Sequence, residues 1–270
     1  MADSVFERFL ALHHQASPLM MPNAWDVGSA LIFESLGFEA LATTSSGFAA
    51  TLGRLDGGVG REEVLGHARA IAAAVSIPVS ADLENCYADD PNGVAQTVIL
   101  AAQTGLAGCS IEDYDRNVDA IYPIEVAVDR THAAAEAAHG GATQLVLTGR
   151  CENFLHGRAD LSDTIARLQA YQEAGADVLF APGVNSADDL RVLVASVDRP
   201  VNVLPRPGMP TVGELRALGV RRISVGGSLC WAALDAAVRG ATELRDHGTY
   251  GYWSAVPDGL AAARAAFATE

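Results

Sequence analysis

Short apolar runs alternate with longer amphipathic segments along nearly the whole chain. The runs have the length of strands, whereas the segments between them repeat their apolar residues at helical spacing. Eight runs are expected to be strands: Leu19–Asn23, Ala40–Thr44, Pro78–Asp82, Gly108–Glu112, Leu145–Gly149, Val178–Ala181, Val201–Leu204 and Arg222–Gly226. The helices expected between them include Arg61–Val75, Val94–Gln103, Ile124–Ala138, Ser162–Ala174, Ala187–Val197 and Val212–Leu218.

Strands that alternate with helices predict a parallel sheet, and eight such units predict a (β/α)8 TIM barrel of the α/β class. Glycines such as Gly175 and Gly219 stand where helices should stop before the next strand. An open doubly wound sheet is the alternative, but no G-x-G-x-x-G motif follows the first expected strand. No Ser/Pro/Gly-rich linker divides the chain, so residues 1–270 are expected to form one barrel domain with a helical tail after Gly248.

Acidic residues follow two of the expected strands. Asp82 and Glu84 end the third strand, and Glu112 and Asp113 end the fourth. Strand side chains alternate with a period of two, so the spacing Asp82-x-Glu84 is expected to place both carboxylates on one side. Carboxylates at such a point suit a hard cation such as Mg²⁺, with Mn²⁺ as the alternative.

Other polar residues gather at the same expected edge of the barrel, where the chemistry of this architecture takes place. They are Thr44-Ser45-Ser46-Gly47 after the second strand, Asp56 in the following loop, Arg150 and Glu152 after the fifth strand, and Asn202 on the seventh. The set matches a site for Mg²⁺ and a small carboxylate. Individual members have structural alternatives: Asp56 as a turn residue, Glu112 as a salt-bridged rim residue, and Arg150 as a neutraliser of the acids.

Composition narrows the range of functions. All 18 Lys and Arg residues are arginine, which excludes Schiff-base lysines, pyridoxal-phosphate enzymes and the P-loop. A net charge of −15 argues against nucleic acid as a partner. No apolar run is long enough for a membrane span, and the N-terminus shows no export signal. Four scattered cysteines lack CxxC spacing, which favours a reduced, cytoplasmic setting.

Several motifs together resemble the isocitrate lyase/phosphoenolpyruvate mutase superfamily, from Met21-Pro-Asn-Ala-Trp-Asp26 to Ser224-Val-Gly-Gly227. The residues that carry the resemblance are Leu52-Gly-Arg-Leu-Asp56, Ala81-Asp-Leu-Glu-Asn-Cys-Tyr87, Ile111-Glu-Asp113 and Gly149-Arg-Cys-Glu152. The resemblance implies a barrel whose last helix is swapped between subunits of a homodimer or homotetramer.

By the same resemblance Asp82 would contact Mg²⁺ directly, and Asp56, Glu84 and Glu112 would hold its waters. Thr44, Ser45, Ser46, Gly47 and Arg150 would bind the carboxylate and 2-oxo oxygen of the substrate, with Asn202 on the far side of the pocket. Arg150, Glu112 and Asp56 are the expected catalytic residues.

The chain departs from the better-known lyases of that superfamily. The segment Asp113–Pro123, expected to be a mobile loop over the site, lacks their loop cysteine, lysine and histidine. Activity on isocitrate or 2-methylisocitrate is therefore not expected. Cys86 stands where relatives have glycine, and we interpret it as a packing residue, with a role as acid or nucleophile as the alternative. His132 and His156 are expected on helix surfaces.

The expected function is a Mg²⁺-dependent reaction on a small 2-oxo acid through an enolate. The leading expectation is cleavage of a carbon–carbon bond, or decarboxylation, in an oxaloacetate-like substrate. Phosphonopyruvate mutase or hydrolase chemistry is the enzymatic alternative, and a 2-oxo acid binding protein without turnover is the alternative of another class.

Overall fold

The computed structural model describes residues 4–268, which form an alternating series of strands and helices. The strands are β1 (Leu19–Met21), β2 (Asn23–Ala24), β3 (Leu41–Thr43), β4 (Val79–Asp82), β5 (Gly108–Glu112), β6 (Tyr114–Asp115), β7 (Ala120–Ile121), β8 (Val146–Arg150), β9 (Val178–Phe180), β10 (Val201–Val203) and β11 (Arg222–Ser224). The α-helices are α1 (Val5–Leu12), α2 (Val27–Ser35), α3 (Ser45–Thr51), α4 (Arg61–Ala74), α5 (Pro91–Ala102), α6 (Ile124–Gly140), α7 (Leu161–Glu173), α8 (Ala187–Ala195), α9 (Val212–Ala217), α10 (Ser228–His247) and α11 (Val256–Phe267), with a 3₁₀ turn η1 (Gly251–Ala255) before the last.

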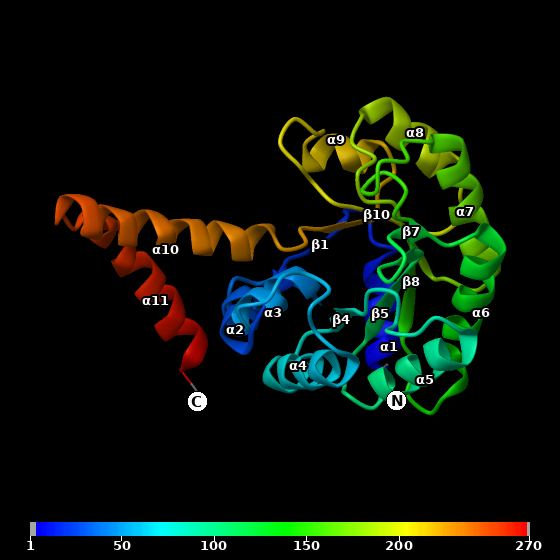
Figure 1. Cartoon of the computed structure of the whole chain (residues 1–270), viewed down its shortest axis with the longest axis horizontal. Helices are drawn as coiled ribbons and strands as arrows, with labels where there is room; N and C mark the ends of the chain where they lie inside the picture. Colours follow the sequence, from blue (N-terminus) through cyan, green and yellow to red (C-terminus); the bar gives the residue numbers. More distant parts are fainter. Residues whose placement is uncertain (1–3, 269–270) are drawn as a thin grey trace.

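One parallel sheet closes into a barrel (Figure 1), in the order β1-β11-β10-β9-β8-β5-β4-β3-β2. The first strand is divided at Pro22, with β1 pairing with β11 and β2 with β3. Proline has no N–H to donate to a sheet, which accounts for the break. Counting β1 and β2 as one strand, the barrel has the eight parallel strands expected from the sequence, and the (β/α)8 prediction is confirmed.

Local signals set the ends of the helices. The Asp90 carboxylate accepts from the N–H groups of Asn92 and Gly93 at 2.9 and 3.1 Å, so α5 begins at Pro91, earlier than its apolar period indicated. After α7 the chain turns at Gly175 with φ of +108°, a conformation that favours glycine. The hairpin of β6 and β7 is an element that the apolar pattern did not predict.

Helix α1 fills the end of the barrel from which the strands start. Phe9 on this helix is fully buried among Leu19, Met21 and Val146. A methyl group on Gly108 would come within 2.8 Å of the Phe9 ring and 2.7 Å of the Val146 carbonyl oxygen, so only glycine fits there. The packing leaves the opposite end, where the strands finish, open for a site.

The tail leaves the barrel. Helix α10 extends away from it, and α11 turns back and packs against α2 of the same chain (Figure 1). Large apolar side chains on α10 are exposed, among them Trp231 at 48% and Val238 at 62%. Exchange of the terminal helix between subunits stays a prediction. No helix within residues 4–268 is long and apolar enough to cross a bilayer.

Candidate active site

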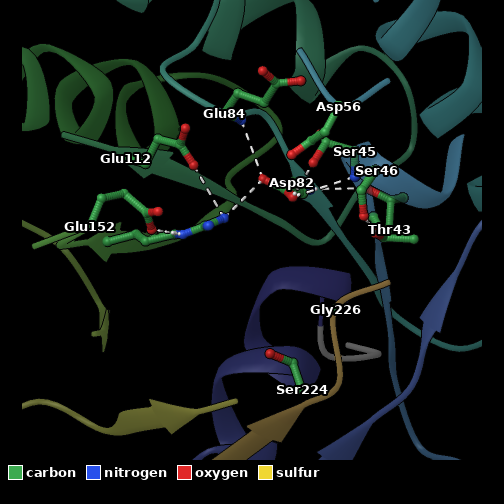
Figure 2. Close-up of polar contacts among 12 residues, drawn as sticks. Thr43, Ser45, Ser46, Asp56, Asp82, Glu84, Glu112, Glu152, Ser224 and Gly226 are labelled. Atoms are coloured by element: carbon green, nitrogen blue, oxygen red, sulfur yellow. Dashed lines mark hydrogen bonds and ion pairs between the residues drawn. The ribbon is translucent and has the colours of Figure 1, made fainter. Parts of the chain in front are cut away.

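The acidic residues and the arginine expected at the site meet at the carboxyl ends of neighbouring strands. Asp82, Glu112 and Arg150 are the last residues of β4, β5 and β8, and Glu112 lies beside Arg150 in the strand register. In Figure 2, Glu112, Glu84 and Asp56 lie around Asp82, with the Glu84 carboxylate directed away from it. The parallel barrel therefore assembles the constellation that the separate strand ends indicated.

Glu84 was expected beside Asp82 because side chains alternate along a strand. It does lie near Asp82, but that reason was wrong, because Glu84 is in a turn after the strand. Strand β4 ends at Asp82, and Glu84 has φ of +51° in a turn that also holds Cys86 at +60° and Tyr87 at +54°. The Glu84 N–H donates to Asp82 Oδ1 at 3.3 Å, and the Tyr87 hydroxyl donates to Glu84 Oε1 at 3.0 Å. Three left-handed non-glycine residues in one turn mark a strained backbone beside the acids.

Arg150 neutralises part of the acidic charge. Its Nη1 lies 3.2 Å from Glu112 Oε2 and 3.5 Å from Asp82 Oδ1, and its Nε pairs with Glu152. Burial raises the pKa of Glu112 well above its ordinary value, although Arg150 opposes the rise. Burial would also raise the pKa of Glu152, but Arg150 and His156 hold it below its usual range. The arginine is thus a fixed positive charge among carboxylates.

A second arginine, which the sequence analysis missed, lies in the acidic group. Arg116 is in the hairpin loop between β6 and β7, and its Nε lies 2.7 Å from Glu84 Oε2. Its Nη2 lies 3.5 Å from Asp56 Oδ2 and 3.7 Å from Glu112 Oε1. Burial raises the pKa of Glu84 to about 7, and Arg116 limits the rise. Five carboxylates (Asp56, Asp82, Glu84, Glu112 and Glu152) thus face only two guanidinium groups.

The group fits a hydrated hard cation. Its donors are carboxylate oxygens, and burial without enough positive charge keeps Glu84 and Glu112 from ionising at their ordinary pKa values. Within residues 4–268, no three acidic, histidine or cysteine side chains converge closely enough to ligate a metal together. The donor chemistry therefore fits such a cation, and the division into one direct ligand and water-mediated acids stays a prediction.

Hydroxyl groups line the other side of Asp82. The Ser45 hydroxyl donates to Asp82 Oδ2 at 3.1 Å, and the Asp82 N–H donates to Thr43 Oγ1 at 2.9 Å. Thr44 caps helix α3, since its Oγ1 accepts from the Gly47 N–H at 3.3 Å. The turn therefore presents Ser45 and Ser46 next to Asp82 (Figure 2), and Thr44 lines the same cavity.

One cavity of about 280 Å³ is shared by Asp82, Arg150 and the hydroxyl turn, whereas Glu112 does not line it. Its lining includes Thr44, Ser45, Ser46, Asp56, Asp82 and Arg150 from the expected set, and also Arg206, Arg222 and Ser224. Glu84 borders a larger, more open groove of about 660 Å³ with Arg116. The cavity is small for a ligand pocket, which favours a compact substrate.

Two expected substrate-binding residues stand back from the cavity. Gly47 is buried in the first turn of α3, where a methyl group would come within 2.5 Å of Thr44 Cγ2. Asn202 is buried on β10, and its Nδ2 donates to Ser224 Oγ at 2.8 Å. Gly47 and Asn202 therefore pack against or bond to residues that line the cavity. A direct contact of either residue with the substrate stays a prediction.

Three candidates from the sequence remain: Cys86, His132 and His156. The Cys86 thiol is fully buried, and burial raises its pKa to about 12, which supports the packing interpretation. His132 lies on the exposed surface of α6 as expected. His156 does not lie on a helix surface: it is in the loop after β8, stacks on Tyr114 at 3.5 Å between ring centroids, and has Nε2 3.6 Å from Glu152 Oε2.

A buried network behind the site fixes the segment after β8. Asp113 Oδ1 accepts from the Glu152 N–H at 2.8 Å, and its Oδ2 accepts from the Tyr171 hydroxyl at 2.5 Å and from Arg167 Nη1 at 3.1 Å. Asp113 is 2% exposed. The carboxylate therefore positions Glu152, and through it Arg150, without facing the cavity.

Comparison with known proteins shows the family of the chain. The profile of the phosphoenolpyruvate phosphomutase family matches residues 9–245. An uncharacterized protein of Mycobacterium tuberculosis H37Rv is 37% identical over 244 residues, which cover 88% of this chain and 89% of that protein. A crystal structure from Burkholderia cenocepacia J2315, described as a lyase/mutase, is 46% identical with a TM-score of 0.93, over 98% of this chain and 96% of that one.

An oxaloacetate decarboxylase of Chromohalobacter salexigens is 28% identical over 260 residues, which cover 88% of this chain and 84% of that enzyme. The similarities span the whole barrel, including every strand end that contributes to the site. The chain belongs to the phosphoenolpyruvate phosphomutase family, within the phosphoenolpyruvate mutase/isocitrate lyase superfamily.

Proposed function

We propose that this protein is a Mg²⁺-dependent enzyme that binds a small 2-oxo acid and cleaves a carbon–carbon bond at its C3. Decarboxylation of an oxaloacetate-like substrate is the leading reaction. The observation that carries the proposal is the cavity in which Asp82, Arg150 and the Thr44–Ser46 turn face one small volume. Enzymes of this superfamily typically use Mg²⁺ and act on 2-oxo acids, and one relative is an oxaloacetate decarboxylase.

The residues divide the work as follows. Asp82 would hold Mg²⁺ directly, and Asp56, Glu84 and Glu112 would hold its water molecules. When bound, the cation supplies Lewis-acid polarisation of the 2-oxo group. The hydroxyls of Thr44 and Ser46 can donate hydrogen bonds to the substrate carboxylate, and Ser45 would do so once its hydroxyl leaves Asp82 Oδ2.

Arg150 has the role of electrostatic stabiliser. When the bond from C3 to the leaving carboxylate breaks, its electron pair moves into the 2-oxo group, which becomes an enolate, and CO₂ departs. The guanidinium of Arg150 is held in place by Glu112 and Glu152. It therefore needs no reorganisation as negative charge develops on the oxygen of the 2-oxo group. C3 of the enolate then takes a proton.

Phosphorus–carbon chemistry is the second candidate, because the matching family profile is that of a phosphoenolpyruvate phosphomutase. A phosphonopyruvate mutase or hydrolase would use the same carboxylate and 2-oxo contacts. Turnover of oxaloacetate with release of CO₂ supports the leading proposal, whereas phosphate release or rearrangement of phosphonopyruvate supports the second. Absence of turnover with a panel of 2-oxo acids would favour a binding protein.

The metal assignment is tested separately by calorimetry. Asp82→Ala should abolish Mg²⁺ binding, because it removes the direct ligand and leaves the other acids repelling one another. Asp188→Ala is the control, since Asp188 is exposed and pairs with Arg191 on α8. Unchanged Mg²⁺ affinity in the Asp82 variant would overturn the assignment.

We also propose that the protein is a homodimer or homotetramer. The support is the exposed apolar surface of α10, with Trp231, Leu234 and Val238 each more than 40% exposed. Contiguous apolar surface of this kind marks an interaction site. Light scattering on the eluting protein should give a mass above that of one 28.1 kDa chain, and a monomer at micromolar concentration would contradict the proposal.

A further inference from the structure

The inner part of the cavity is polar, which is unusual for the interior of a barrel. Ser80, Ser110 and Ser224 line it from β4, β5 and β11, together with Arg222. Barrel interiors of this type are filled mainly by branched apolar side chains. Arg222 is the first residue of β11, so it lies nearer the amino ends of the strands than Asp82 or Arg150.

Arg222 differs from the other buried arginines of the chain. Arg130 donates to the carbonyl oxygens of Asn85, Ala88 and Asp89 at 2.6 to 2.7 Å. Arg167 and Arg150 each pair with carboxylates. Arg222 is 5% exposed, its Nε has no hydrogen-bond partner, and within residues 4–268 no carboxylate pairs with it.

Its one polar contact offers no negative charge. Arg222 Nη1 lies 3.5 Å from His13 Nε2, at the end of α1. His13 Nδ1 lies 2.8 Å from the Phe9 carbonyl oxygen, so Nδ1 carries the hydrogen and Nε2 is the acceptor of a neutral ring. Burial and the nearby guanidinium lower the pKa of His13 to about 3, and burial lowers that of Arg222 to about 9. The inner cavity is therefore electropositive at neutral pH.

The hydroxyl group of Ser224, which lines the cavity with Arg222, is free to donate a hydrogen bond. Ser224 Oγ accepts from Asn202 Nδ2 at 2.8 Å, which leaves the Ser224 hydrogen free to donate. Ser224 lines the cavity across from Asp82 (Figure 2). Asn202 Oδ1 is buried without a hydrogen-bond partner. Among residues 4–268, the Asn202 amide therefore forms its side-chain hydrogen bond with Ser224 alone.

We propose that Arg222 and Ser224 form an anion subsite at the inner end of the cavity, which binds a second charged oxyanion group of the substrate. The inference rests on the proposed function and deepens it: Arg222 and Ser224 would hold the second carboxylate of the 2-oxo acid, and Asn202 positions Ser224. Arg150 already has three carboxylate partners, whereas Arg222 has none. A buried unpaired guanidinium is unfavourable, and a ligand carboxylate would compensate it.

The test compares ligands that differ in that group. Calorimetry with Mg²⁺ present would measure the binding of 3,3-difluorooxaloacetate, which has two carboxylates, and of 2-oxobutyrate, which has a methyl group in place of the second and no fluorine at C3; each variant is therefore compared with the native protein for one ligand at a time. Phosphonopyruvate, which has a phosphonate in place of the second carboxylate, is the third ligand and shows which of the two groups the subsite binds. Arg222→Met should weaken the two-carboxylate ligand roughly 10- to 100-fold, the range of a charged hydrogen bond, and change 2-oxobutyrate by less than about threefold.

Arg221→Met is the matched control, because the neighbouring arginine lies outside the cavity and donates to the Gln15 carbonyl oxygen. It should leave both affinities unchanged. Arg222→Lys should recover part of the lost affinity, because it restores the charge. If Arg222→Met does not fold, Ser224→Ala should show the same selective loss at a smaller size, roughly 3- to 10-fold.

The outcomes are distinct. Equal loss for both ligands in Arg222→Met, or no loss for either, would overturn the subsite. Selective loss for phosphonopyruvate alone would show that the subsite takes a phosphonate and overturn the carboxylate assignment. If the native protein binds none of these ligands with Mg²⁺, the proposed function itself fails, and the subsite fails with it.

Discussion

Arg116 lies in the acidic group that is proposed to hold Mg²⁺, so its replacement by glutamine should tighten Mg²⁺ binding. Its guanidinium contacts Glu84, Asp56 and Glu112, three of the four acids expected around the metal. It comes from the β6–β7 hairpin loop, which lies outside the barrel strands. A cation must therefore displace Arg116 or be repelled by it.

The size of the effect follows from the exposure of the pair. At 2.7 Å, Coulomb's law with an effective dielectric constant of 20 gives an upper bound of about 6 kcal/mol for Arg116 and Glu84. The Arg116 side chain is 32% exposed, so solvent screening and the entropy of a long side chain reduce the net value to about 1 kcal/mol. Arg116→Gln should accordingly lower the Kd for Mg²⁺ roughly fivefold.

Isothermal titration calorimetry on chelator-treated protein would measure the change at pH 8.5, above the pKa of about 7 of Glu84. The high pH matters because loss of Arg116 raises the pKa of Glu84 further, and a protonated carboxyl does not attract a cation. Arg158→Gln is the control, since Arg158 pairs with Asp163 rather than with an acid of the site, in a more exposed ion pair. Weaker Mg²⁺ binding in Arg116→Gln at pH 8.5 would show that Arg116 supports the metal site, and would refute the reasoning.

Three further outcomes are expected. In the native protein, Mg²⁺ affinity should rise as the pH passes through 7, because Glu84 has a pKa of about 7 and must lose its proton; a flat profile by calorimetry from pH 6 to 8.5 would contradict this. Cys86→Ala should change turnover only a few-fold in steady-state assays, whereas a loss of about two orders of magnitude would identify its thiol as a general acid. Asp113→Asn should lower the free energy of unfolding by about 3 kcal/mol in urea titrations, because Asp113 pairs with buried Arg167; a change as small as that of exposed Asp188→Asn, about 0.5 kcal/mol, would be contrary evidence.

Much of the fold was predictable from local signals. The apolar runs marked all eight barrel strands, and the acids and Arg150 at their ends marked the edge that holds the site. Both depend on periodicities of two and 3.6 residues, which a sequence displays directly. The interpretation of Cys86 as a packing residue also agrees with its full burial, and its φ of +60° explains why a glycine would suit that position.

The sequence alone determined the order of strands and helices and which residue types follow each strand. Only the tertiary structure decided that Glu84 reaches Asp82 through a left-handed turn, that Arg116 enters the acidic group, and that Arg222 lies buried without an acid partner. These contacts join residues from different strands and loops, such as Arg116 and Asp56, separated by 60 positions. Closure of the barrel brings them together, and no local period of the sequence records that closure.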